Sequence, residues 1–183
     1  MFENNGAAMT LIAAISVGAL LVGACSQPAR PERMSTETAS ALAAGEAPKI
    51  ATLFITVYGE DVGGFASHYY PLPREDYEAA LKDSIARSEL FATSATPDDA
   101  DYDVNVGLIS LVAPKWSGTV TLETSWSVTA PNRGDEIARQ MIRSETPSPF
   151  GKVRESTEEV ARMSIDSGLA WLDATLAPMK SGD

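Results

Sequence analysis

The alternation of side chains in residues 119–128 is the feature that most restricts how this chain can fold. One set of alternating positions is mostly apolar and comprises Val120, Leu122, Thr124, Trp126 and Val128; the other is polar and comprises Thr119, Thr121, Glu123, Ser125 and Ser127. Because successive side chains of a strand point to opposite faces of a sheet, this period of two predicts a strand with one buried face and one solvated face. Such a strand is typical of an antiparallel sheet that is covered on one side.

The sequence around this strand predicts three further strands and two helices. Residues 50–58 are rich in β-branched and aromatic residues and apolar on both faces, which is typical of a central strand. Within residues 102–112 the apolar alternation changes phase beside Gly107, which indicates a β-bulge. The other predicted elements are a strand over 136–146 after a turn at 132–135, a helix over 73–91 opened by Pro73, and a helix over 153–176 ended by Pro178.

The predicted order of elements is therefore β-α-β-β-β-α. This order predicts an α+β domain over residues 49–179, in which two helices cover one face of a mostly antiparallel four-stranded sheet. The hydrophobic content of 44% supplies enough apolar side chain for a core, and it places the chain outside the disordered class.

Charge and cysteine content narrow the classes of function. The formal net charge is −11, and such an acidic surface repels phosphate backbones, so we expect no nucleic-acid partner. A single cysteine cannot form an internal disulfide, and with one histidine the chain lacks the usual zinc ligand sets. We therefore expect neither a metal nor a cofactor.

The N-terminal part of the chain has the pattern of an export signal. Residues 9–24 form an uncharged, mostly apolar run that is shorter than the roughly 20 residues of a membrane-spanning helix but suits a signal peptide. The run closes with Val22-Gly23-Ala24-Cys25, which resembles the lipobox of bacterial lipoproteins. This resemblance implies that residues 1–24 are a signal peptide cleaved between Ala24 and Cys25, and that the Cys25 thiol receives a diacylglycerol through a thioether.

Two features bear on this interpretation. The first residues, MFENNGAA, carry only Glu3 as a charged side chain where such signals usually have Lys or Arg, so translation could start at Met9 instead of Met1. An uncleaved N-terminal helix is the alternative, and it would attach the chain to a membrane too.

Ser26 follows the cysteine where Asp is the inner-membrane retention signal, so the resemblance favours the outer membrane. Residues 25–48 hold few large apolar side chains, which predicts a flexible tether.

The whole arrangement is similar to that of small periplasmic lipoproteins of the YajG and transporter-auxiliary kind. The resemblance rests on the lipobox ending at Cys25, a helix that ends in Ser88-Glu89-Leu90-Phe91, a meander whose middle strand carries Trp126, and a closing helix. It implies a non-enzymatic, lipid-anchored, periplasm-facing protein that binds another envelope protein within a transport or assembly complex.

Several side chains outside the lipobox are candidates for a site. Phe65, Tyr69 and Tyr70 lie in the loop over 59–73 and could form an aromatic patch for a partner, or could pack that loop onto the sheet. His68 lies between them; a hydrolase built around it would need an acidic residue and a serine or threonine nearby, and no nucleophile motif such as G-x-S-x-G occurs.

Charged residues give two further candidates. Arg139 and Arg143 share one face of the strand over 136–146, where they either solvate an edge strand or bind an anionic partner. Acidic residues gather at 98–103, but they lack the glycine turn and the bidentate glutamate of a calcium loop, so a solvated loop is the better interpretation. Trp116, Trp126 and Trp171 are interpreted as packing residues.

Two functional hypotheses follow for the domain. The first is the partner-binding lipoprotein. The alternative is a binding module for a small apolar ligand such as lipid, which would need a large apolar cavity between the sheet and the helices.

Overall fold

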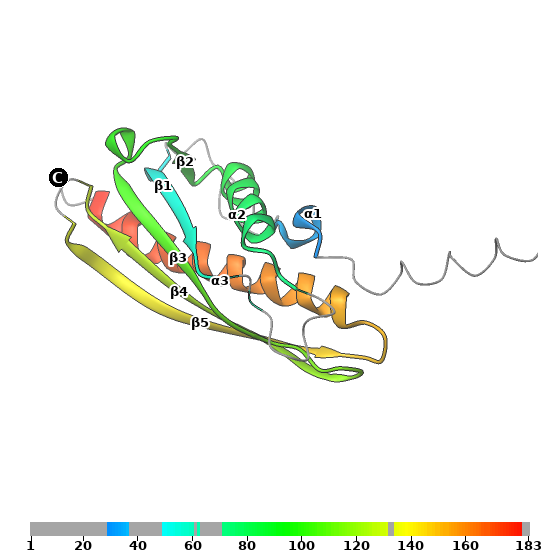
Figure 1. The fold of residues 1–183 in the computed structure, drawn as a ribbon. Coiled ribbons are helices and arrows are strands. Elements are labelled where there is room, and N and C mark those ends of the chain that lie inside the picture. The colour runs from blue at the N-terminus through cyan, green and yellow to red at the C-terminus, as the bar shows by residue number, and fades with distance from the viewer. Residues whose placement is uncertain (1–28, 37–48, 61, 63–70, 132–133, 181–183) are drawn as a thin grey trace, which may run out of the picture.

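A five-stranded sheet in the order β2-β1-β3-β4-β5 forms one layer of the protein (Figure 1). Its strands are β1 (Ala51–Tyr58), β2 (Phe91–Thr93), β3 (Tyr102–Val112), β4 (Gly118–Thr129) and β5 (Glu136–Ser148). The helices are α1 (Pro31–Met34), α2 (Arg74–Ser88), the short 3₁₀ helix η3 (Pro97–Asp99) and α3 (Val153–Lys180). This computed structural model describes residues 29–36, 49–60, 62, 71–131 and 134–180.

The sheet is mixed, which corrects the prediction of four mostly antiparallel strands. Strand β1 pairs in parallel with both β2 and β3, whereas β3, β4 and β5 form an antiparallel meander. The missed strand is β2, because the predicted helix was extended to Phe91. Helix α2 ends at Ser88, and Glu89 then takes a left-handed conformation with φ of 56° that turns the chain back along the sheet. The β1-α2-β2 unit is thus a parallel crossover.

The apolar strand patterns are otherwise confirmed, but the polar face of β4 is not solvated throughout, because Ser125 and Ser127 are buried. The alternate residues of β4 from Val120 to Val128 are all fully buried. The bulge in β3 also exists: the register of β3 and β4 shifts between Leu108 and Ser110, next to the predicted position, and Ile109 between them is half-exposed. Strand β1 is central, between β2 and β3, as its composition predicts.

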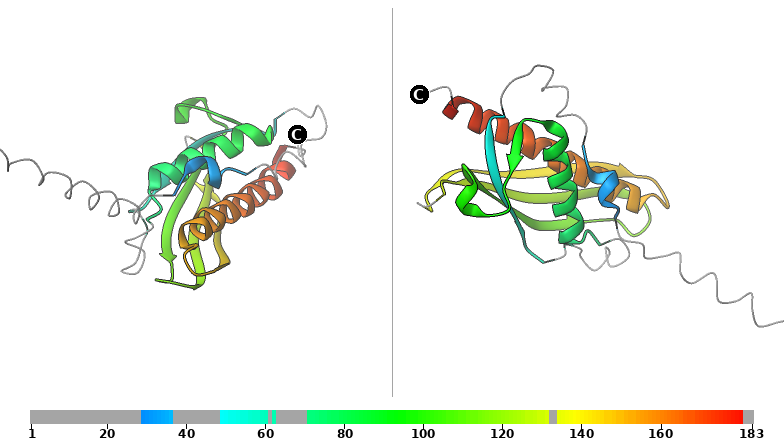
Figure 2. Two further views of the ribbon diagram at one scale, coloured as in Figure 1. Left: turned by 90° about the vertical axis from the view of Figure 1, so that its right-hand side faces the viewer. Right: turned by 90° about the horizontal axis from the view of Figure 1, so that it is seen from above.

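All three α-helices lie on one face of the sheet (Figure 2). Helix α2 packs on β1 and β2, α3 packs on β4 and β5, and α1 lies between α2 and α3. The Trp126 side chain fills the layer between β4 and α3. A Cβ atom placed on Gly168 of α3 would lie 2.2 Å from the Trp126 ring, so α3 can approach this closely only because Gly168 has no side chain.

Helix α3 is longer than predicted. The sequence predicts that Pro178 ends it, but the helix continues to Lys180. Proline removes one hydrogen bond to the preceding turn and its ring crowds the carbonyl of residue i−4, which disfavours a long continuation; only two residues, Met179 and Lys180, follow Pro178 in α3.

Candidate functional site

The segment Ala29–Thr36, here called the N-terminal segment, is bound to the helical side of the domain. It lies within residues 25–48, for which the composition predicts a flexible tether. Met34 of α1 is fully buried between α2 and α3, and Ala29 and Thr36 are also buried. One large apolar side chain and a set of polar contacts therefore hold a stretch whose average composition is that of a linker.

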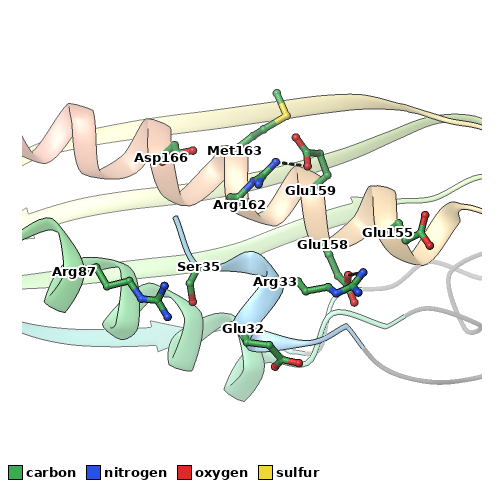
Figure 3. A pocket seen from close by; sticks show the side chains of 10 residues that line it. All are labelled: Glu32, Arg33, Ser35, Arg87, Glu155, Glu158, Glu159, Arg162, Met163 and Asp166. Atoms are coloured by element: carbon green, nitrogen blue, oxygen red, sulfur yellow. Dashed lines mark hydrogen bonds and ion pairs between the residues drawn. The ribbon is translucent and has the colours of Figure 1, made fainter. Parts of the chain in front are cut away.

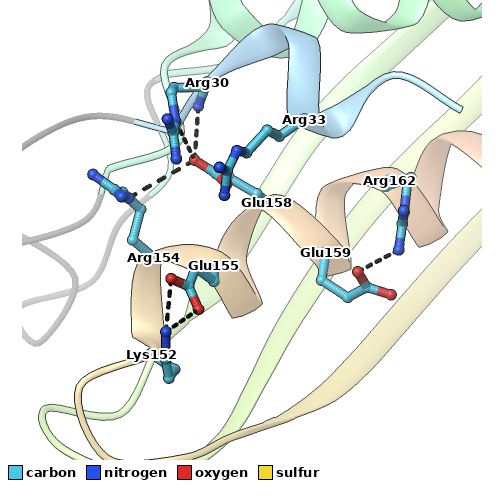
Figure 4. Close-up of polar contacts among 8 residues, drawn as sticks. All are labelled: Arg30, Arg33, Lys152, Arg154, Glu155, Glu158, Glu159 and Arg162. Atoms are coloured by element: carbon cyan, nitrogen blue, oxygen red, sulfur yellow. Dashed lines mark hydrogen bonds and ion pairs between the residues drawn. The ribbon is translucent and has the colours of Figure 1, made fainter.

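The main polar contact of the N-terminal segment is the carboxylate of Glu158, in the second turn of α3 (Figure 4). The Arg30 main-chain N–H and Nε donate to Glu158 Oε1 at 3.2 and 3.4 Å. Arg33 Nη1 lies 3.7 Å from Oε2, and Arg154 Nε lies 3.9 Å from Oε1. The Glu158 side chain is 3% exposed. Because a buried carboxylate is unfavourable without partners, Glu158 depends on the N-terminal segment as much as the segment depends on it.

The other end of the N-terminal segment is fixed by Thr36. Its main-chain N–H donates to Ser84 Oγ of α2 at 3.0 Å, and its hydroxyl donates to the Asp166 carboxylate of α3. Next to it, the Ser35 hydroxyl lowers the pKa of Asp83, and Arg87 adds to this effect. The segment is therefore held on α3 at its Arg30 end and bridges α2 and α3 at its Thr36 end.

A cleft of about 800 Å³ opens between α1, the C-terminal end of α2 and α3 (Figure 3). Its lining consists of Glu32, Arg33, Ser35, Arg87, Glu155, Glu158, Glu159, Arg162, Met163 and Asp166. Five of these side chains are acidic, three are basic and one is apolar. Ligand pockets for apolar molecules are lined mostly by hydrophobic side chains, so this cleft does not favour the hypothesis of an apolar ligand.

Hydroxyl groups form a network inside the core. Tyr77 Oη lies 3.1 Å from Ser164 Oγ, which lies 3.0 Å from Thr124 Oγ1, and Trp126 Nε1 donates to Thr124 Oγ1 at 3.0 Å. Burial raises the pKa of Tyr77 above its usual value. All four residues are fully buried and come from α2, α3 and β4. The network therefore joins the two layers, and a substrate could not reach it.

The structure places Arg139 and Arg143 together on the edge strand β5, on the face of the sheet that the described helices leave uncovered (Figure 2) and that is here called the uncovered face. Arg139 Nε donates to Glu136 Oε2 at 3.0 Å. Arg143 Nη1 lies 3.2 Å from Glu123 Oε1, and its Nη2 lies 2.6 Å from Glu145 Oε1. These carboxylates raise the pKa of both guanidinium groups. The face therefore presents paired charges of both signs instead of a purely basic surface for an anion.

The remaining predicted site residues have different outcomes. Ala24, Cys25, Phe65, His68, Tyr69 and Tyr70 lie outside the described residues, so the lipobox and the aromatic patch stay predictions, and the disfavoured hydrolase alternative around His68 stays untested. In the acidic stretch, Asp101 accepts a hydrogen bond from the Thr52 main-chain N–H at 2.7 Å.

Within the described ranges, no group of three or more His, Cys, Asp or Glu side chains could hold a metal ion. In that same part of the chain, no helix combines the length and hydrophobicity needed to cross a membrane.

Sequence reasoning missed an exposed aromatic pair. Trp126 is a core residue and Trp171 packs partly against the core, as predicted, but Trp116 is 59% exposed. Its ring stacks on that of Phe150, which is 73% exposed, with 5.7 Å between the centroids and 9° between the planes. The signal was present in the sequence: Phe150 stands between a proline and a glycine, and Trp116 lies in a turn beside Lys115. Bulky rings in turns have no strand or helix face on which to be buried.

Comparisons with known proteins show similarity at the level of the fold. No family model matches the chain, and no curated protein matches it. The structure is similar to that of protein XCC0632 from Xanthomonas campestris, of family DUF330, with 12% identity, coverage of 76% of this chain and 94% of that one, and a TM-score of 0.59. It is also similar to the hypothetical protein CT253 from Chlamydia trachomatis, with 6% identity, coverage of 72% and 99%, and a TM-score of 0.55.

A third similar structure is the minor lipoprotein from Acinetobacter baumannii, with 10% identity and coverage of 70% of this chain and 94% of that one. Its TM-score of 0.38 is too low to support an argument about this chain. The arrangement of a mixed sheet with helices on one face is thus shared with known bacterial proteins, and the function has to be argued from the residues of this chain.

Proposed function

We propose that this chain is a lipid-anchored protein of the bacterial envelope, attached through Cys25 and facing the periplasm, and that it serves as a non-enzymatic, partner-binding component of a transport or assembly complex. The observation that carries the proposal is the sequence Val22-Gly23-Ala24-Cys25 at the end of the apolar run 9–24. Small residues before the cysteine allow the backbone to enter a signal peptidase site. Acyl chains contribute about 0.8 kcal/mol per buried CH₂, so two or three chains hold a protein firmly in a membrane.

The described residues support a non-enzymatic role. The polar network around Tyr77 is enclosed in the core, and the charged cleft beside α1 is lined by ion-paired side chains such as Glu158 and Arg162. Neither arrangement places a nucleophile beside a general base in an accessible position, which catalysis by group transfer requires.

The uncovered face of the sheet supports a partner-binding role. It carries the paired Arg139 and Arg143, and between them Met141 is 53% exposed. Tyr58, on the same face, lies across Gly107 of β3: a Cβ on Gly107 would be 2.7 Å from the Tyr58 ring. An aromatic and a thioether side chain among fixed charges are the components of a protein interface, in which an apolar centre is surrounded by polar groups.

Cell fractionation tests the anchor. The full chain is expressed in a Gram-negative bacterium, and we expect it in the membrane fraction, whereas Cys25→Ser is expected to lose membrane attachment through lipid. Ser26→Ala is the matched control, because it changes the neighbouring residue and leaves the cysteine available; it should behave as the wild type. Because the apolar run 9–24 can itself hold an unprocessed chain in a membrane, the deciding readout is acyl mass on the extracted chain: a wild type without added acyl mass, or equal acyl mass in Cys25→Ser, would contradict a lipid anchor.

Crosslinking in the same cells tests the partner-binding role. A photoreactive residue at Met141 samples the uncovered face, and one at Met163 samples the helical side as a control. We expect a discrete adduct from position 141 that weakens when Arg143→Glu is added. Adducts of equal yield from both positions, or none from position 141, would contradict recognition by the uncovered face.

A further inference from the structure

One end of the domain carries the exposed aromatic pair, and it is here called the tip. The tip consists of residues 113–117, between β3 and β4, and residues 149–152, between β5 and α3. Pairing of Gly118 with Ser148 brings the two loops together. Gly118 and Gly151 have φ values of +149° and +75°, which favour glycine, so the backbone of each loop depends on its glycine.

The composition of the tip is that of a surface that contacts lipid headgroups. Trp116 and Phe150 stack on each other yet remain mostly exposed, and Lys115 Nζ lies 5.4 Å from the centre of the Trp116 ring. Lys152, in the other loop, is paired with Glu155, its Nζ 2.9 Å from Glu155 Oε2, so Lys115 is the cation on which contact with headgroups rests. Tryptophan is enriched at membrane–water interfaces because its ring is apolar and its N–H can stay hydrated, and lysine beside it pairs with anionic headgroups.

The path of the chain directs the tip toward the membrane. Arg30 is bonded to Glu158, which lies five residues into α3, or roughly 7.5 Å along the helix from its first residue, Val153. Cys25 precedes Ala29 by four residues, and four extended residues span at most about 14 Å. The bound N-terminal segment therefore keeps Cys25 close to the end of the domain where α3 starts, which is also the end that carries the tip.

The charge distribution agrees with this orientation. Near the start of α3, Glu155, Glu158 and Glu159 are each paired with a basic side chain, whereas Asp98, Asp99, Asp101, Asp103 and Asp135 lie at the opposite end of the sheet. Strand β4 runs the length of the sheet with twelve residues, so the two ends are roughly 36 Å apart. That distance is several times the Debye length of about 8 Å at physiological ionic strength. With the tip on the bilayer, repulsion between these carboxylates and anionic lipids is screened; with the acidic end on the bilayer, it would not be.

We propose that the tip inserts Trp116 and Phe150 into the headgroup region of the membrane that holds the Cys25 lipid, so that the domain stands on the bilayer with its acidic end away from it. This inference rests on the proposed lipid anchor. It adds a second, peripheral contact, so the domain has a defined orientation and the uncovered sheet face stays accessible at the side.

Fluorescence quenching tests the contact. The full chain is purified from membranes, its acylation is checked by mass, and it is reconstituted into vesicles of phosphatidylethanolamine and phosphatidylglycerol with and without a phosphatidylcholine brominated near the headgroup end of its acyl chains. Bromine quenches a tryptophan that lies at that depth. We expect quenching of the wild type, loss of the quenching in Trp116→Phe, and retention of it in the matched control Trp171→Phe.

The outcomes separate this inference from the anchor. A chain that carries no acyl group and does not enter the vesicles overturns the proposed anchor and this orientation with it. An acylated, incorporated chain whose fluorescence is not quenched, or whose quenching persists in Trp116→Phe, overturns the tip contact and leaves the anchor intact. Self-association of the acylated chain in detergent that Phe150→Glu abolishes, without quenching in vesicles, would show that the tip binds a second copy instead of lipid.

Discussion

The two faces of the sheet are made from the same strands but differ in what holds their side chains. On the face covered by the helices, Leu122 and Trp126 of β4 are fully buried. On the other face, side chains of the same strand such as Glu123 form ion pairs with β5 and remain in contact with water. Apolar burial contributes about 25 cal/mol per Å², whereas an exposed ion pair contributes about 0–1 kcal/mol. Stability therefore resides on the covered face, and the open face can change without loss of the fold.

This difference shows where a function can be placed. The helical side must keep its shape, since Trp126 leaves no space at Gly168 and Glu158 has to keep its partners. The open face and the tip carry the exposed large side chains, among them Trp116 and Met141. A surface that contributes little to folding can be adapted to a partner or a membrane.

The largest effect on the free energy of unfolding is expected from Gly168→Leu, which breaks the contact between α3 and β4. Even a Cβ atom at this position would lie 2.2 Å from the Trp126 ring, so the leucine must push α3 away from β4. We expect a loss of about 3 kcal/mol or more in the free energy of unfolding, measured by urea denaturation of the full chain. Ala170→Leu, on the exposed side of α3, is the control and should change it by less than about 0.5 kcal/mol. Similar losses in both variants would contradict the close packing.

Substitutions at neighbouring residues of β4 compare directly how much the two faces of the sheet contribute to stability. Leu122→Ala removes a fully buried side chain, and we expect it to lower the free energy of unfolding by about 3 kcal/mol. Thr121→Ala, on the open face, should lower it by less than about 1 kcal/mol. The same denaturation experiment measures both. If Thr121→Ala were as costly as Leu122→Ala, the open face would contribute to stability and the comparison would fail.

Glu158→Gln tests the docking of the N-terminal segment. The amide keeps the volume but loses the charge that Arg30, Arg33 and Arg154 face, and these arginines are partly exposed. We expect a loss of about 2 kcal/mol, less than for a fully buried pair, and faster hydrogen exchange in residues 29–36. The matched control is Glu159→Gln, which removes the exposed pair with Arg162 and should leave that exchange unchanged. Unchanged exchange in Glu158→Gln would show that apolar contacts alone hold the segment.

The smallest expected effect is a pH dependence of how firmly the N-terminal segment is bound to the domain. Because the pKa of Asp83 is lowered in the folded chain, mainly by the Ser35 hydroxyl, its contribution to stability is complete above the ordinary value of 3.8 and is lost as the pH falls through the lowered pKa. Glu158 and Asp166 face the segment as well. The protection of residues 29–36, which is the exchange rate relative to its intrinsic rate at each pH, should therefore fall in acid, and Asp83→Asn should remove part of that fall. Identical acid dependence of wild type and Asp83→Asn would exclude a role for Asp83.

The sequence predicted correctly those elements whose apolar side chains recur at a fixed spacing. The apolar positions of β4, the phase change in β3 and the helix over 153–176 each follow from the geometry of one element, and the structure contains all three. The end of α2 could not be found in this way, because Ser88-Glu89-Leu90-Phe91 continues the helical pattern. The left-handed Glu89 and the pairing of Phe91 with Ala51 depend on β1, which is distant in sequence.

The site was predicted less well for the same reason. Arg139 and Arg143 were placed on one face correctly, but their pairing with glutamates depends on how β4 and β5 are aligned. The docking of residues 29–36 depends on Met34 and Glu158, which are far apart in the chain and meet only after folding. Average composition cannot reveal such a contact, since one buried side chain and one carboxylate decide it.

The intact mass of the chain extracted from membranes tests the central claim most directly. The account predicts a chain that begins at Cys25 and ends at Asp183, with the added mass of a diacylglycerol and of acyl groups, and it predicts that Cys25→Ser lacks this species. A membrane-extracted chain that still carries residues 1–24 and no lipid would contradict the lipoprotein assignment.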